Sequence, residues 1–240
     1  MKKYKKRFSI KETNINIILD NPKYFKLAKE IILDCRAKIE RFILEHPYFL
    51  SSLEPIDIES DDEIINLMLS SAFKANTGPM ASVAGAISEM VVKKIDTNFI
   101  IAENGGDIAL RGKDVIVALY SGNSKISGEI AFRIKNKKIY GVATSSAKIG
   151  HSISFGYADS VTVFAKSAAL ADAAATAICN YTIGKNKEEM INKALERADD
   201  IEGIDGVFIV IDDLVGIKGK IPELVKVDKK ITFGELFDIY

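Results

Sequence analysis

The sequence has little of what a disulfide framework or a zinc cluster needs. Its 240 residues include only two cysteines, Cys35 and Cys179. Two cysteines can supply neither a disulfide network nor a four-thiolate zinc site. Each lies within an apolar pattern of helical period, so we expect both to be buried, reduced thiols.

An excess of charge of either sign is also missing. The 33 Lys and Arg residues balance the 33 Asp and Glu residues, and 48% of the chain is hydrophobic. The balance gives no support for non-specific nucleic-acid binding, and the hydrophobic fraction excludes intrinsic disorder. A chain of this length can bury a sizeable core.

Long hydrophobic runs are absent as well. No stretch approaches the ~20 apolar residues of a membrane span. The N-terminal segment MKKYKKRFSIKETNIN carries the positive charges of a signal peptide, but no apolar region follows them. We therefore expect a cytoplasmic protein without a membrane partner. No repeat or low-complexity linker divides residues 1–240, which predicts a single domain, and nothing indicates its oligomeric state.

Hydrophobic periodicity predicts blocks of helices and strands rather than strict alternation, which favours an α+β fold with a mixed antiparallel sheet and packed helices. Segment 48–54 is expected to cross over as an apolar loop. The expected helices span 22–45, 61–75, 80–94, 167–181 and 188–199, and the expected strands span 4–10, 14–19, 99–102, 108–111, 115–120, 129–134, 138–143, 159–165 and 206–211 onward.

Four short segments contain residue types that packing explains poorly. The first is Glu103-Asn104-Gly105-Gly106-Asp107, directly after an apolar strand. Adjacent glycines permit positive φ angles and expose backbone N–H groups that can cradle a phosphate. A hairpin turn is the alternative, because this composition is common in turns.

The second segment is Ala143-Thr144-Ser145-Ser146-Ala147, also at a strand end. Its three hydroxyls suit recognition of phosphate, ribose or amide groups, while a helix N-cap is an equally good interpretation.

The third segment is the glycine-bounded loop around His151, one of two histidines in the chain. Its ordinary pKa of ~6.5 suits acid–base chemistry near neutral pH. A surface histidine without a catalytic role is the alternative.

The fourth segment is an alanine-rich helix that carries Asp172 and Thr176. Residues four apart share one helix face, so the carboxylate and the hydroxyl can supply two oxygen ligands to Mg²⁺. A local hydrogen bond, or a role of Asp172 at a helix N-terminus, explains the same residues.

Taken together, the order of these motifs resembles the ApbE-like flavin transferases, which carry an N-x-G-G-D turn, an A-T-S segment, a histidine loop and an A-D-x-x-x-T helix. The likeness covers roughly residues 76 to 180. Over nearly its whole length the chain looks still closer to an uncharacterised prokaryotic family of that superfamily, marked here by Gly78-Pro79-Met80-Ala81 and by the segment Glu103–Ile108.

The resemblance implies a single ApbE-like, tunnelling-fold-like domain that binds FAD as substrate or ligand. In the transferases, Mg²⁺ assists cleavage of the pyrophosphate, and the FMN half passes to a hydroxyl of an acceptor protein. Carried over to this chain, the resemblance implies metal ligands at Asp172 and Thr176 and catalytic roles for His151 and Asp107. The implied ligand-binding residues are Gly78, Met80, Asn104, Gly105, Gly106, Thr144, Ser145 and Ser146.

Four positions depart from the transferase pattern. Ala84 stands where a Lys is usual, Glu89 where an Asp is usual, and Ser154-Phe155 replaces an Asp-Pro. Two hypotheses follow: a Mg²⁺-dependent flavin-nucleotide transferase or pyrophosphatase, and a protein of the same fold that binds a nucleotide or another small ligand without turnover. The retained Asp172, Thr176 and His151 favour the first, and the missing residues favour the second.

Overall fold

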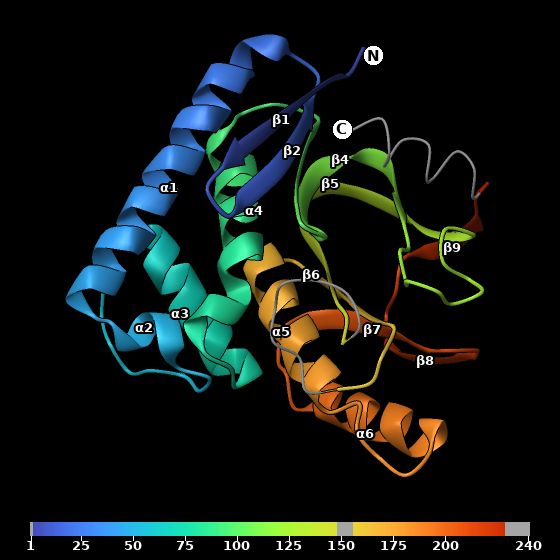
Figure 1. Ribbon diagram of the computed structural model, residues 1–240. Coiled ribbons are helices and arrows are strands. Elements are labelled where there is room, and N and C mark those ends of the chain that lie inside the picture. Colours follow the sequence, from blue (N-terminus) through green and yellow to red (C-terminus); the bar gives the residue numbers. More distant parts are fainter. Residues whose placement is uncertain (1, 148–155, 229–240) are drawn as a thin grey trace.

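The computed structural model describes residues 2–147 and 156–228 (Figure 1). His151, Ser154 and Phe155 lie outside the described residues, so their roles stay predictions.

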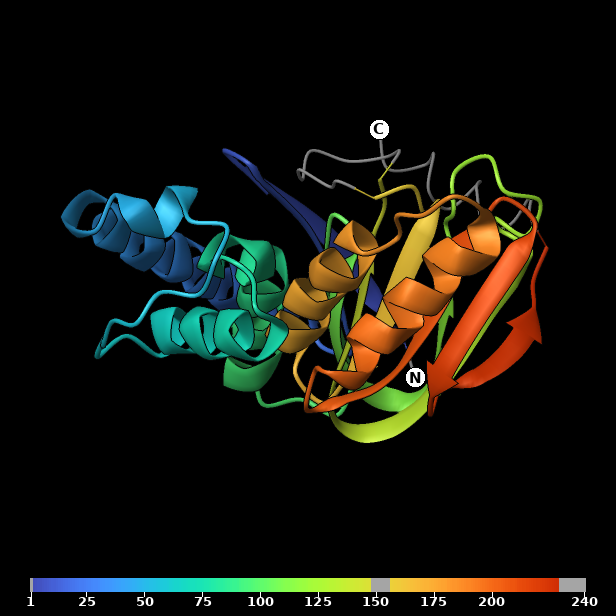
Figure 2. The same ribbon diagram turned by 90° about the horizontal axis from the view of Figure 1, so that it is seen from below.

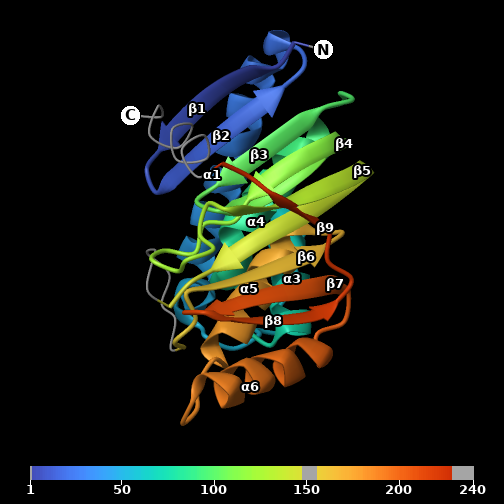
Figure 3. The same cartoon turned by 90° about the vertical axis from the view of Figure 1, so that its right-hand side faces the viewer.

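One antiparallel sheet forms the centre of the described structure, with the order β1-β2-β3-β4-β5-β6-β7-β8 and with β9 paired to the first part of β5. Figure 3 shows this order from β1 at the top to β8 near the bottom, with β9 crossing in front. The strands are β1 (Tyr4–Ile10), β2 (Thr13–Leu19), β3 (Ile100–Asn104), β4 (Asp107–Ala118), β5 (Ile130–Ser145), β6 (Ser160–Ala165), β7 (Ile204–Ile211), β8 (Leu214–Gly219) and β9 (Glu223–Lys226).

The helices gather on one side of this sheet (Figures 1 and 2). Two of them, α4 and α5, pack against the middle strands and against each other, and α1, α2 and α3 form a further layer beside them. The helical elements are η1 (Pro22–Tyr24), α1 (Phe25–Glu45), α2 (Tyr48–Ser51), α3 (Glu63–Ala75), η2 (Pro79–Ser82), α4 (Val83–Lys94), α5 (Ala168–Asn180) and α6 (Lys187–Asp199).

This architecture confirms the predicted α+β class with an antiparallel sheet and packed helices. Two local predictions were wrong. Segment 48–54 is not only a loop, because Tyr48–Ser51 form the short helix α2. The four short strands expected between 108 and 143 are two long strands, β4 and β5, because the polar residues near Gly112 make register shifts within the ladder instead of ending the strands.

Each face of the sheet carries its own core. On the helix side, Ala143 of β5 and Val163 of β6 pack with the alanines of α5. On the opposite face, Phe132, Phe164 and Phe208 pack edge to face, with the centroid of the Phe132 ring 4.8 and 5.3 Å from those of the other two rings. Alternate residues of one strand point to opposite faces, so neighbouring positions of β5 serve different cores.

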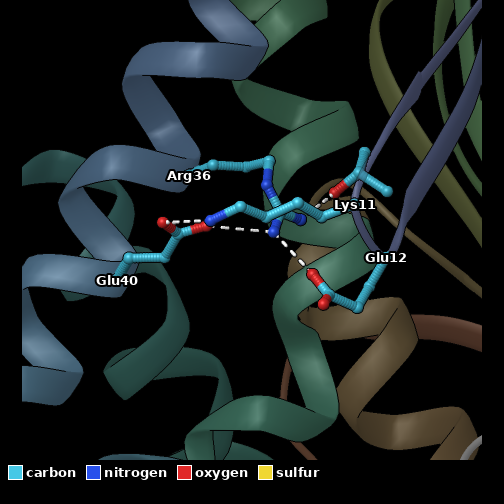
Figure 4. A network of polar contacts seen from close by, with 5 residues as sticks. Lys11, Glu12, Arg36 and Glu40 are labelled. Carbon is cyan, nitrogen blue, oxygen red and sulfur yellow. Dashed lines mark hydrogen bonds and ion pairs between the residues drawn. The ribbon is translucent and has the colours of Figure 1, made fainter.

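A polar network joins the turn between β1 and β2 to α1 (Figure 4). The Arg36 guanidinium donates to Thr13 Oγ1 and Glu12 Oε2 at 2.6 Å and to Glu40 Oε1 at 3.0 Å. Lys11 Nζ also donates to Glu40, at 2.8 Å. The network fixes the hairpin of β1 and β2 on α1.

The described part of the chain contains no helix that is both long enough and apolar enough to cross a membrane. Cys35 and Cys179 are buried cysteines outside any disulfide, as the sequence predicts. Burial raises the pKa of the Cys35 thiol to about 11, so this thiol is not a nucleophile near neutral pH.

Candidate functional site

The site begins at Asp172, whose carboxylate is buried at the start of another helix. Asp172 lies in the second turn of α5, and its Oδ2 accepts a hydrogen bond of 2.8 Å from the Gly85 backbone N–H of α4. Burial raises the pKa of Asp172 to about 7, while the N–H groups of Gly85 and Ala84 oppose the shift. The sequence alternative in which Asp172 serves a helix N-terminus is realised at α4, not at its own helix.

Small residues allow Asp172 to reach the N-terminus of α4. A Cβ atom on Gly85 would lie 2.3 Å from the Ala168 carbonyl oxygen and 2.8 Å from Asp172 Cβ. A Cβ atom on Gly141 of β5 would lie 2.5 Å from Ala168 Cα. Backbone therefore meets backbone where α4, α5 and β5 converge, which explains the alanines and glycines of these segments.

Asp107, the first residue of β4, brings a second carboxylate to the same place. Burial is the largest cause that raises the pKa of Asp107 well above its usual range, followed by the negative charges of Asp172 and Glu103. The Thr144 N–H donates to Asp107 and opposes the shift. Ser88 Oγ of α4 donates to the Asp107 carbonyl at 3.1 Å, which ties the start of the strand to the helix.

The turn before Asp107 is a two-residue β-hairpin loop, and a ligand-binding role for Gly105 and Gly106 stays a prediction. Asn104 pairs with Asp107 across the hairpin, and the two glycines have φ angles of +67° and +104°. The Gly106 N–H donates to Glu103 Oε1 at 3.0 Å. Asn104 is buried, and its Nδ2 donates to the Ala84 carbonyl at 3.5 Å, so the turn is attached to the first turn of α4.

The hydroxyl segment lies at the end of β5, and its side chains diverge. Thr144 and Ser145 are the last two residues of the strand, which excludes the N-cap interpretation for them. Thr144 Oγ1 lies 3.0 Å from Thr162 Oγ1, so they share a hydrogen bond. Ser145 alternates with it toward the α5 side. Its buried hydroxyl has no hydrogen-bond partner among the residues that the structure describes, whereas Ser146 has an interaction partner.

For three further predicted residues, Thr176, Gly78 and Met80, the structure gives a position and the surrounding packing. Thr176 follows Asp172 by four residues on α5 and is half-buried. A Cβ atom on Gly78 would lie 1.8 Å from the Ser52 carbonyl oxygen, so packing alone accounts for this glycine. Met80 is half-buried and packs against the large core beneath α1 and α3. Binding roles for Gly78 and Met80 stay predictions.

Sequence reasoning gave no role in the site to Gly85, Ser88 and Glu89. Gly85 and Ser88 stand in the run of small residues in helix 80–94, which is the signal that pointed to a close approach of backbones. Glu89 was noted only as a departure from the transferase pattern, yet its Oε2 accepts hydrogen bonds from Ser167 Oγ at 2.7 Å and from the Ala169 N–H at 3.2 Å.

The donor atoms of this site suit a hard cation. Within residues 2–147 and 156–228, no three His, Cys, Asp or Glu side chains form a group that could hold a metal ion. The carboxylates available there are Asp172 and Asp107, each with a raised pKa, and Thr176 lies one turn further along α5. Mg²⁺ uses one or two carboxylates and keeps waters or phosphates as its other ligands, and two like charges in a buried place favour a bound cation. The residues therefore fit Mg²⁺.

Comparison with known proteins shows the family and the fold. A family model described as "AbpE bacteria" matches residues 1–218. The UPF0280 protein MJ1526 of Methanocaldococcus jannaschii is 64% identical over 242 residues, which is 99% of each chain. A UPF0280 protein of Methanococcus vannielii is 50% identical over the full length of both chains.

Two crystal structures have the same fold at low identity. The ApbE protein of Thermotoga maritima superposes with a TM-score of 0.53 at 13% identity and covers all of both chains. The apo flavinyl transferase ApbE of Pseudomonas stutzeri superposes with a TM-score of 0.50 at 14% identity, over 98% of this chain and 97% of its own.

Proposed function

Because this chain belongs to the AbpE bacteria family, we propose that it is a Mg²⁺-dependent flavin-nucleotide transferase or pyrophosphatase that acts on FAD or a related nucleotide. The observation that carries the proposal is the pair of neighbouring carboxylates, buried Asp172 and half-buried Asp107, whose pKa values are both raised. The shared fold with a protein named a flavinyl transferase supports the substrate class.

Each residue of the site has a role in this proposal. Asp172 and Thr176 hold Mg²⁺, which when bound neutralises negative charge on the pyrophosphate oxygens. Asp107 accepts the proton of the attacking hydroxyl, because a carboxylate with a raised pKa is a stronger base than an ordinary one. Asn104, Gly105, Gly106 and the segment 144–146 bind the nucleotide beside them.

The reaction exchanges one phosphorus–oxygen bond for another. The hydroxyl oxygen of the acceptor, either a protein side chain or water, forms a bond to the phosphorus of the FMN half. The bond between that phosphorus and the bridging oxygen breaks, and AMP leaves with the electron pair. The hydroxyl proton passes to Asp107, and His151 orients a phosphate or carries a proton.

One observation favours a second candidate, a nucleotide-binding protein without turnover. Ala84 brings no cation to the site, and its backbone N–H is engaged with Asp172. A missing positive charge would slow pyrophosphate cleavage without preventing binding.

The test uses purified protein, FAD and Mg²⁺, with FMN and AMP as the measured products. We expect turnover, and we expect a chelator to abolish it. Asp107→Asn should slow turnover by about 10²–10⁴-fold, and Asp172→Ala should abolish it. Thr176→Ala should weaken cation affinity less than Asp172→Ala does. The matched control is Asp34→Ala, which removes a carboxylate from the outer helix α1. Binding of FAD without products would support the second candidate, and absence of both would overturn the proposal.

A further inference from the structure

Each of the helices α4 and α5 contributes a carboxylate that accepts hydrogen bonds from the N-terminus of the other helix. At α4, the N-cap residue Ser82 makes no capping bond, because its hydroxyl donates to the Pro79 carbonyl at 2.9 Å. The N–H groups of Ala84 and Gly85, the second and third residues of α4, donate instead to Asp172 of α5. A residue from the neighbouring helix therefore acts as the cap.

The reverse arrangement exists at α5. Glu89 of α4 accepts from the N–H of Ala169, the second residue of α5, and from the hydroxyl of the N-cap residue Ser167. Ser167 Oγ in turn accepts from the Leu170 N–H at 3.2 Å. Each carboxylate lies at the positive end of the other helix, where the helix dipole favours a negative charge.

These two contacts fix how α5 lies along α4. Ala169 and Asp172 are three residues apart on α5, and Gly85 and Glu89 are four residues apart on α4, so the two bonds are one helical turn from each other. Gly85 also lies in close contact with the Ala168 carbonyl, next to Ala169. If one bond is lost, the first turn of α5 can shift, and the Asp172 carboxylate shifts with it.

We propose that Glu89 is a positioning residue, which fixes the Asp172 carboxylate beside Asp107 by anchoring the N-terminus of α5. The inference rests on the proposed function in one respect, namely that Asp172 is a cation ligand. It assigns to Glu89 no contact with substrate or cation.

The first measurement is Mn²⁺ affinity, by calorimetric titration of the full chain. Glu89→Ala removes both the acceptor and the charge, and we expect it to weaken Mn²⁺ binding by about tenfold, as the loss of supporting residues around metal ligands does. Glu89→Gln keeps an acceptor oxygen and should restore part of the affinity. The matched control is Glu30→Gln, since Glu30 is an exposed carboxylate on α1 and should leave the affinity unchanged.

The second measurement needs no metal. Hydrogen exchange of the Gly85 amide reports directly on its bond to Asp172, and we expect slow exchange in wild type and faster exchange in both Glu89 variants. Amides of the edge strand β1 should be unaffected.

The outcomes separate the inference from the proposed function. If wild type binds no Mn²⁺, the proposed cation site fails, and Gly85 exchange alone decides the role of Glu89. If Glu89→Ala is folded and leaves both the affinity and the exchange unchanged, the positioning role is wrong. If Glu89→Ala does not fold, Glu89→Gln decides by the same two measurements.

Discussion

Asp172 shows what it costs to bury a carboxylate. Its burial favours the protonated acid, and the two N–H groups of α4 only partly offset this cost. The folded state therefore binds a proton more tightly at Asp172 than the unfolded chain does. Because the pKa of Asp172 differs between the folded and unfolded states, the unfolding free energy depends on pH.

In metal-free protein, ionised Asp172 destabilises the folded state. Its pKa is about 7 when folded and near its ordinary value of 3.8 when unfolded, so the unfolding free energy should fall as pH rises from about 4 to 7. Asp172→Asn keeps an acceptor for the Gly85 N–H and removes the charge. We expect this variant to have a higher melting temperature than wild type above pH 7, with the difference shrinking toward pH 4.

Thermal unfolding in the presence of a chelator, from pH 4 to 8, measures this difference. Asp34→Asn on α1 serves as the control, since Asp34 is an exposed residue. A difference between Asp172→Asn and wild type that is the same at every pH would contradict the raised pKa.

At the residue scale, the sequence indicated Asp172, Asn104 and Asp107 through motif order, but not what holds them. The Asp172–Gly85 bond joins residues 87 positions apart, and no local pattern encodes such a pair. The run of small residues around Gly85 indicated only that another backbone segment or a ligand approaches this helix closely. The capping role of Glu89 is visible only in the packed pair of helices, because its partner Ala169 is 80 positions away in the sequence.

At the scale of elements, helix boundaries were predicted better than strand continuity. Helix 167–181 was expected and α5 spans Ala168–Asn180, because Ser167 is a favourable N-cap and the alanines are strong helix formers. The polar stretch around Gly112 was interpreted as a break between strands. It is a bulge, where Asp114 has a φ of +61°, and its stability comes from pairing with β5, which the local sequence does not show.

The hairpin between β3 and β4 gives a prediction that separates its two glycines. Both glycines have positive φ angles, as a type I′ turn requires. Asn tolerates the φ of +67° found at Gly105, but it does not tolerate the φ of +104° found at Gly106. Gly105→Asn should change the unfolding free energy by less than about 0.5 kcal/mol, while Gly106→Val should cost about 1–3 kcal/mol. Added atoms have space at both positions, since the nearest atom to a Cβ on Gly106 is the Thr144 oxygen at 3.8 Å, so strain causes the difference.

Chemical denaturation of the two variants checks this prediction. FAD affinity, measured alongside, should fall for Gly106→Val, because the hairpin that places Asn104 and Asp107 is distorted. Equal stability of the two variants would show that the turn does not hold these φ angles in solution.

At the scale of the whole molecule, the site draws together α4, α5, the hairpin of β3 and β4, and the end of β5. These segments lie between residues 83 and 180. The fold class and the identity of the segments could be predicted from periodicity and motif order, whereas their convergence depends on backbone contacts at Gly85 and Gly141. A ligand bound there should stabilise the fold as a unit, because it contacts elements from both the helix layer and the sheet.

The last prediction follows from that linkage. At a free Mg²⁺ concentration 100 times its dissociation constant, binding to the folded state alone adds about 2.7 kcal/mol to the unfolding free energy. For a chain of this length that corresponds to an increase in melting temperature of roughly 5–10 °C. At one fixed Mg²⁺ concentration, the increase should be larger at pH 8 than at pH 6, because protons compete with the cation for Asp172 and Asp107. Asp172→Ala should abolish the increase and Thr176→Ala should reduce it, whereas Asp34→Ala should keep it in full. An equal increase in wild type and Asp172→Ala would place the cation elsewhere on the molecule and leave the paired carboxylates without the role assigned to them.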